Sequence, residues 1–105
     1  MMIKTIAKQL QALGNPTRLE VFRQLIRSGS DGVAVGDIQK VLDIPGSTLT
    51  HHLQKLMAAN LVGQERKGAV LICRANFDAM GAMFNFLNSE CCADETGSSV
   101  PEKDG

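Results

Sequence analysis

The sequence contains no tryptophan, no tyrosine and only four phenylalanines, so aromatic residues make up 4% of the chain. Its core must therefore be mainly aliphatic and methionine-based, drawn from the 44% of the 105 residues that are hydrophobic. No apolar run approaches the roughly 18 residues that a membrane span needs, and no segment of the secretory type begins the chain. We expect one soluble, cytoplasmic domain with no membrane partner.

Cysteine is scarce and odd in number. Three cysteines do not make a disulfide framework, and burial or thiol chemistry explains them better in a reducing compartment. Cys73 lies in an apolar predicted strand and is interpreted as buried and inert. Cys91 and Cys92 are adjacent and follow the last predicted helix, where two exposed thiols favour a functional role.

Net charge is also lacking, because eleven basic and eleven acidic residues cancel. The two signs are unevenly distributed along the chain. Residues 1–88 hold ten of the basic and six of the acidic residues, a net charge of +4, whereas residues 89–105 carry −4. The folded part is therefore moderately basic, as nucleic-acid binding requires. Residues 93–105 are polar and acidic, and they are predicted to form a disordered tail.

Hydrophobic periodicity predicts a mainly α-helical domain with a small β-hairpin over residues 1–92. The predicted helices run over 3–13, from 16 to about 27, 35–42, 47–59 and from 77 to about 87, with strands at 61–66 and 70–74. Asn15 is the expected N-cap of the second helix. The third and fourth helices, joined by a tight turn, have the helix-turn-helix pattern. A hairpin directly after them is typical of a wing, so the predicted fold is a winged helix-turn-helix.

Three short motifs resemble one known family. The runs Leu13–Leu19 (LGNPTRL), Thr48–Leu56 (TLTHHLQKL) and Ala59–Val62 (ANLV) are similar to those of ArsR-family (ArsR/SmtB-type) transcriptional repressors, over roughly residues 3–92. The resemblance implies a homodimer that represses an operon by binding double-stranded operator DNA until an inducer releases it. A two-fold dimer presents two recognition helices about one DNA turn apart, so the expected operator is an imperfect palindrome.

The fourth predicted helix is the candidate recognition helix. Its leucine stripe turns polar side chains outwards, where they can hydrogen-bond base edges or contact phosphates. Thr50 and His51 are the best candidates for base contact, because the N-terminal half of such a helix enters the groove deepest. His52 is interpreted instead as a packing or phosphate-contacting residue. The predicted DNA-binding residues are Ser47, Thr48, Thr50, His51, Gln54 and Lys55 on the helix, and Arg66 and Lys67 on the wing.

A polar helical face of this kind is, on its own, more often simply solvated. The short helix before it and the basic hairpin after it favour DNA. Apolar residues near both ends of the chain either complete a monomer core or form the dimer interface that the resemblance implies. The predicted interface residues are Ile3, Leu10, Met80, Met83, Phe84 and Leu87.

The resemblance also bears on the inducer. Many of these repressors carry a cysteine where this chain has Ala34, and residues 77–92 lack the histidines of the zinc and nickel sensors. Another arsenic-sensing arrangement adds a third cysteine about six residues after a vicinal pair, and that position here is Ser98. Inorganic arsenite has three exchangeable positions, whereas a methyl- or aryl-substituted trivalent arsenical has two. Cys91 and Cys92 therefore favour an organoarsenical such as methylarsenite, followed by arsenite or antimonite.

Two alternatives of other classes stay open. The same fold could carry a thiol-based redox or sulfide switch, which needs a cysteine of low pKa. It could also be a winged-helix interaction module without DNA, which only the neutral net charge supports. An enzyme is disfavoured, because the sequence groups no nucleophile with a base and an orienting acid. No cofactor is expected, only a trivalent arsenic species as inducer.

Overall fold

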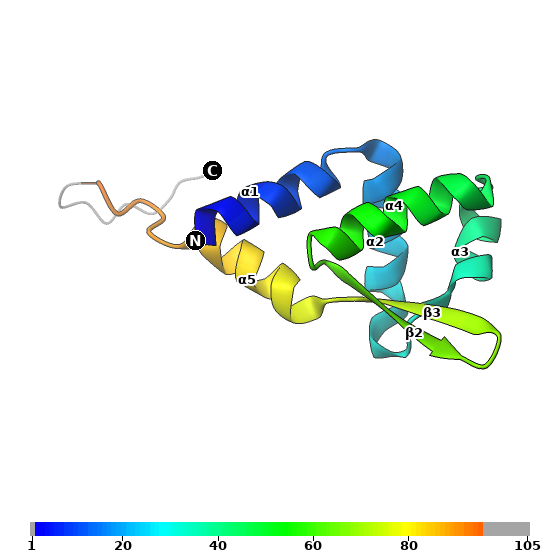
Figure 1. Ribbon diagram of the computed structural model, residues 1–105. Helices are drawn as coiled ribbons and strands as arrows, with labels where there is room; N and C mark the ends of the chain where they lie inside the picture. Colours follow the sequence, from blue (N-terminus) through cyan, green and yellow to red (C-terminus); the bar gives the residue numbers. More distant parts are fainter. Residues whose placement is uncertain (1, 96–105) are drawn as a thin grey trace.

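The computed structural model describes residues 2–95, and its element order confirms the predicted winged helix-turn-helix (Figure 1). The fourth helix begins and ends one residue earlier than predicted. The elements are α1 (Met2–Leu13), α2 (Pro16–Ser28), the 3-10 turn η1 (Gly29–Asp31), β1 (Val33–Ala34), α3 (Val35–Leu42), α4 (Gly46–Ala58), β2 (Val62–Lys67), β3 (Val70–Ala75) and α5 (Phe77–Asn88).

The sheet has three antiparallel strands in the order β1-β3-β2, where the sequence predicted two. In the β2–β3 hairpin Val62 lies opposite Ala75 and Lys67 opposite Val70. Gly68 begins the two-residue turn with φ +63°, a conformation that favours glycine in tight hairpins. The added strand β1 pairs Val33 with Cys73, and it ties the start of α3 to the wing.

The core lies between α2, α3, α4 and the sheet. The leucine stripe predicted for α4 is buried, with Leu49, Leu53 and Leu56 at most 1% exposed. Cys73 is fully buried, as predicted, and burial raises the pKa of its thiol, while the Gln64 amide donates a hydrogen bond to the sulfur at 3.5 Å. This thiol is therefore protonated and shielded, which makes it unsuited to sensing.

Capping residues fix where the helices begin and end. The Asn15 side chain accepts a hydrogen bond from the Arg18 N–H at 3.0 Å, which confirms the predicted N-cap of α2. Asn76 caps α5 in the same way through the Ala79 N–H. Asp43 ends α3 in the left-handed region with φ +52°, so the chain turns within three residues into α4. That short turn sets the helix-turn-helix geometry.

None of the helices in residues 2–95 is both long and apolar enough to cross a membrane. The predicted tail, residues 93–105, is described only as far as Glu95. The N–H groups of Ala93 and Glu95 donate to the carbonyls of Glu90 and Cys92, so the tail begins in hydrogen-bonded turns. The remainder, residues 96–105, lies outside the described residues.

Candidate nucleic-acid interface and thiol site

The outward face of α4 gathers the predicted recognition residues. The buried leucines fix the rotation of the helix, so positions three and four residues apart share the opposite face. Thr48 is half-buried. The other predicted side chains on that face are exposed, namely Ser47, Thr50, His51, Gln54 and Lys55. The structure thus presents hydroxyl, imidazole, amide and ammonium groups on one surface, a set suited to base edges and phosphates.

His52 differs from its neighbour His51. The side chain of His52 is 8% exposed, and its ring lies 5.9 Å from that of His51 with a tilt of 59°. Within the described chain its Nδ1 has no hydrogen-bond partner. Burial, with smaller contributions from the charges of Arg18 and His51, lowers the pKa of His52. The residue is therefore a neutral packing group, and the two rings do not form one metal site.

This buried imidazole predicts acid sensitivity. We expect the free energy of unfolding to decrease as the pH falls below about 6.5, because the unfolded chain then binds a proton that folded His52 resists. The His52→Gln variant should lose less stability between pH 7.5 and pH 5 than the wild type. Urea denaturation at each pH measures this, with exposed His51→Gln as the matched control. Equal losses in wild type and His52→Gln would contradict the assignment.

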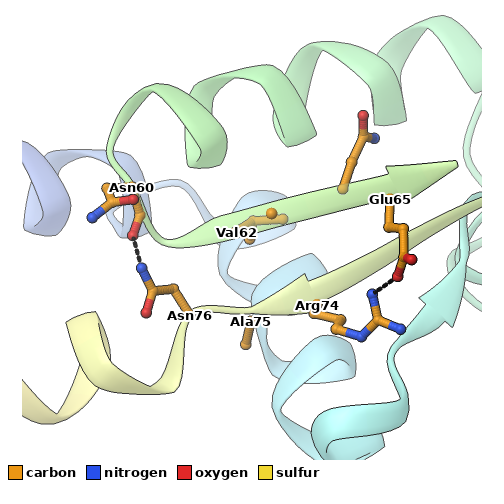
Figure 2. Close-up of a pocket in the computed structure, with 8 residues that line it drawn as sticks. Asn60, Val62, Glu65, Arg74, Ala75 and Asn76 are labelled. Carbon is orange, nitrogen blue, oxygen red and sulfur yellow. Dashed lines mark hydrogen bonds and ion pairs between the residues drawn. The ribbon is translucent and has the colours of Figure 1, made fainter.

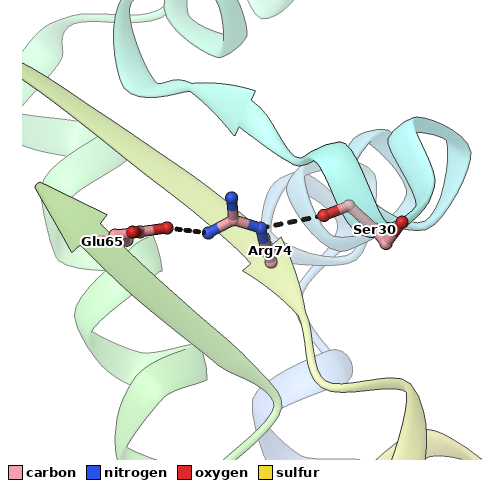
Figure 3. A network of polar contacts seen from close by, with 3 residues as sticks. All are labelled: Ser30, Glu65 and Arg74. Carbon is pink, nitrogen blue, oxygen red and sulfur yellow. Dashed lines mark hydrogen bonds and ion pairs between the residues drawn. The ribbon is translucent and has the colours of Figure 1, made fainter. Parts of the chain in front are cut away.

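The wing exposes two basic side chains, Arg66 and Lys67, near its turn. Behind them, Arg74 joins three elements (Figure 3): its Nη1 lies 2.7 Å from Glu65 Oε1, and its Nε donates to the Ser30 carbonyl at 2.9 Å. The charge of Arg74 is therefore neutralised at the solvent-exposed base of the wing. In residues 2–95 Arg66 and Lys67 have no such ion pair, which leaves their charge available to a phosphate backbone.

A hollow of about 280 Å³ lies beside this contact, over the paired strands β2 and β3 near the start of α5 (Figure 2). Asn76 closes one end by donating a hydrogen bond from its side chain to the Asn60 carbonyl at 3.0 Å. The only charged side chains in the lining are Glu65 and Arg74, which pair with one another. This hollow therefore offers no free acid or base for catalysis. The role of Arg74 was not predictable from the sequence, because its partners are nine and forty-four residues away.

The six predicted interface residues fall into two groups. Ile3, Leu10, Phe84 and Leu87 are 43–59% exposed, and they lie on the two terminal helices α1 and α5. Met80 packs against the core, and Met83 is only 2% exposed. The protomer itself therefore buries Met83, one of the predicted interface residues. The other four residues remain available to a partner.

The two adjacent cysteines lie in turns beyond the end of α5. The Cys91 N–H donates to the Asn88 carbonyl at 3.2 Å, and both Glu90 and Cys92 adopt positive φ values near 60°. Both thiols are free and exposed, and their sulfurs are 3.6 Å apart. Two sulfurs bonded to one atom at about 2.3 Å, the zinc–thiolate length, lie roughly 3.5–3.8 Å apart. The pair is therefore spaced to hold a single soft centre.

The pKa of Cys92 is raised, first by a hydrogen bond with Glu95 and then by the neighbouring Cys91. A protonated thiol is a slow nucleophile towards oxidants, so this environment disfavours a redox-sensing thiol at position 92. Across residues 2–95 the structure brings no three histidine, cysteine or acidic side chains together to bind a metal. Cys73 cannot reach the pair, because it is buried in the sheet.

Comparison with known proteins agrees with this geometry. Residues 13–65 match a family described as a helix-turn-helix domain. The chain is 32% identical over 94 residues to nodulation protein NolR of Rhizobium meliloti, covering 90% of this chain and 73% of that one. It is 30% identical over 91 residues to the arsenical resistance operon repressor of Bacillus subtilis (strain 168), covering 87% and 82%.

One solved structure shares the winged helix-turn-helix fold. It is the homodimeric winged helix-turn-helix DNA-binding domain Mb0332 of Mycobacterium bovis, described as a possible ArsR-family transcriptional regulator. The TM-score is 0.66 at 23% identity, and the match covers 98% of this chain and 91% of that one. Relatives therefore share the architecture, while the two curated names point to different regulated processes.

Proposed function

Because the chain belongs to the ArsR family of DNA-binding winged helix-turn-helix transcriptional repressors, we propose that a trivalent arsenical bound by Cys91 and Cys92 releases it from its operator. Membership of this family makes the protein a regulator and not an enzyme. The observation that carries the inducer assignment is the distance of 3.6 Å between two free, exposed sulfurs. Thiolates select soft centres of this kind.

The binding chemistry is an exchange of oxygen ligands on arsenic for sulfur ligands. Methylarsenite carries two hydroxyl groups on arsenic, and each leaves as water with one thiol proton while an As–S bond replaces the As–O bond. No electrons are transferred, so no oxidant is needed. Two sulfurs complete the coordination of a monosubstituted arsenical, whereas inorganic arsenite would need a third ligand.

The working unit in this proposal is a homodimer on an imperfect palindrome. Four exposed apolar side chains on α1 and α5 offer a surface for a second copy: Ile3, Leu10, Phe84 and Leu87. The cysteine pair follows α5 by three residues. Capture of an arsenical at that point changes the turns next to the dimer surface, and so alters the separation of the two recognition helices. This coupling links the inducer to the DNA.

Operator release in the presence of arsenicals tests the proposal. An operator is first selected from a random duplex library, and its binding is followed by fluorescence polarisation with methylarsenite or arsenite. We expect the affinity of wild type to fall by about tenfold or more, at lower concentrations of methylarsenite than of arsenite. Cys91→Ser/Cys92→Ser should bind DNA normally and ignore both compounds, whereas the control Cys73→Ala should respond as wild type does.

Release of the double variant by either arsenical would show that the sensor lies elsewhere. The redox or sulfide alternative has its own signature. Wild type would then be released by peroxide or a persulfide donor, and mass spectrometry would find a disulfide or persulfide on Cys91 or Cys92. Release by oxidants with no response to arsenicals would favour the redox switch and contradict the arsenical proposal.

A further inference from the structure

A second hollow, of about 390 Å³, lies between α1, α2 and α4, on the side of the molecule where α1 runs beside α4 (Figure 1). One cationic side chain enters its lining from each helix: Lys8 from α1, Arg18 from α2 and Lys55 from α4. The remaining lining consists of an amide and small apolar residues, namely Gln11, Ala12, Ala58 and Ala59. No acidic side chain takes part.

These three charges are not balanced by the protein. The single ion pair of the described chain joins Arg74 and Glu65, so Lys8, Arg18 and Lys55 have no acidic partner in residues 2–95. The Nε of Arg18 is buried and has no hydrogen-bond partner. A buried donor without a partner costs free energy, so a bound acceptor would stabilise this arrangement. Nearby His52 is neutral and adds no competing charge.

We propose that Lys8, Arg18 and Lys55 together bind one phosphate group of the DNA backbone at the edge of each half-site. Phosphate is the chemistry that fits: it supplies negative charge and several acceptor oxygens, and an arginine guanidinium pairs with it directionally. The site goes beyond the single contact expected of Lys55, because it adds α1 and α2 to the DNA surface. It rests on the DNA binding of the family and not on the arsenical.

The position of the hollow along α4 selects a backbone phosphate over a base. Lys55 follows Thr50 by five residues, about 7.5 Å along the helix axis. The N-terminal residues of a recognition helix contact the base edges, so a side chain near the C-terminal end of α4 is placed to meet the backbone. A phosphate held there would fix how far the recognition helix enters the groove, which is what non-specific contacts do for specific ones.

The salt dependence of binding to a duplex of random sequence tests this site, because phosphate contacts are independent of sequence. Each contact contributes about 0.9 to the slope of log affinity against log salt. We expect Arg18→Gln, Lys55→Gln and exposed Lys8→Gln each to reduce the slope by up to about 1 and to weaken binding about tenfold at low salt. Arg18→Gln/Lys55→Gln should lower the slope by little more than either single change, since both residues hold the same phosphate.

Arg23→Gln is the matched control, because it removes one positive charge from an exposed position on α2 outside the hollow. An equal change in slope from Arg23→Gln would mean that the slope depends only on the net charge of the protein, and it would overturn the proposal. Additive slopes in the double variant would overturn the shared phosphate. Titration of inorganic phosphate into ¹⁵N-labelled wild type and Arg18→Gln, followed by NMR chemical shifts, distinguishes a free anion from a DNA phosphate as the ligand. Saturable, Arg18-dependent shifts with unchanged DNA slopes would make this a site for free anions and not for DNA.

Discussion

Replacing Phe84 and Leu87 together by glutamate is expected to give a folded monomer that binds its operator at least about 100-fold more weakly than wild type. Both side chains are more than half exposed in the protomer, at 57% and 54%, so their loss removes little from the core. Across a two-fold interface each would be buried, and the new carboxylates would be left there without partners. The apolar face of α5 would then no longer hold two copies together.

The loss of DNA affinity follows from the loss of bivalent binding. A dimer engages its second half-site intramolecularly, which raises overall affinity by roughly 10²–10⁴ over one half-site alone. Sedimentation equilibrium measures the mass of each protein, and fluorescence polarisation compares a full operator with a duplex carrying one half-site. The variant should match wild type on the single half-site and fail only on the full operator.

Val41→Glu is the control for oligomeric state. Val41 is 62% exposed on α3, outside the predicted interface, so this variant should keep the mass of the wild type. A wild type that sediments at the 11.3 kDa of one chain would contradict the homodimer itself. A Phe84→Glu/Leu87→Glu protein that remains dimeric would instead remove α5 from the interface.

Long periodic segments were predictable because their hydrophobic spacing matches only one type of secondary structure. The stripe of α4 fixes both the helix and its outward face, so the predicted recognition residues lie where the spacing put them. Strand β1 was not predictable, because two residues show no alternation and pair only when β3 is in place. Non-local pairing also hid the bridge from Arg74 to Ser30.

The terminal helix α1 buries a polar position that hydrophobic periodicity did not predict. Periodicity identifies an apolar face but not the surface that it meets. In α1 the buried positions are Ile6, Gln9 and Ala12, while Ile3 and Leu10 point to solvent. Gln9 is buried because its amide donates to the Ala59 carbonyl at 3.3 Å, a contact fifty residues away that sequence spacing does not reveal.

Glycine 32 carries the largest expected effect on stability. Its backbone lies at φ +78° and ψ −174°, a region essentially restricted to glycine. A Cβ at Gly32 would lie 2.7 Å from the Cys73 carbonyl oxygen and 2.8 Å from side-chain carbons of Arg74 and Ile72. The chain therefore enters β1 so close to β3 that no side chain fits between them.

Gly29 provides a matched comparison, because it has a similar backbone, φ +65° and ψ −151°, and open space where its Cβ would be. We expect Gly29→Ala to cost about 1–3 kcal/mol from backbone strain, and Gly32→Ala about 1–3 kcal/mol more from overpacking. The effect of alanine on the unfolded chain is common to both variants and cancels in the difference. Urea denaturation followed by circular dichroism gives both values.

The substitution Gly32→Ala should also lower the affinity for DNA. Relief of the clash separates β1 from β3 and draws Arg74 away from the Ser30 carbonyl, so the wing loses its attachment to η1 while α4 keeps its core contacts. At a temperature where both variants are folded, Gly32→Ala should therefore bind operator more weakly than Gly29→Ala. Equal stability and equal affinity in the two variants would mean that the close approach of β1 to β3 does not position the wing.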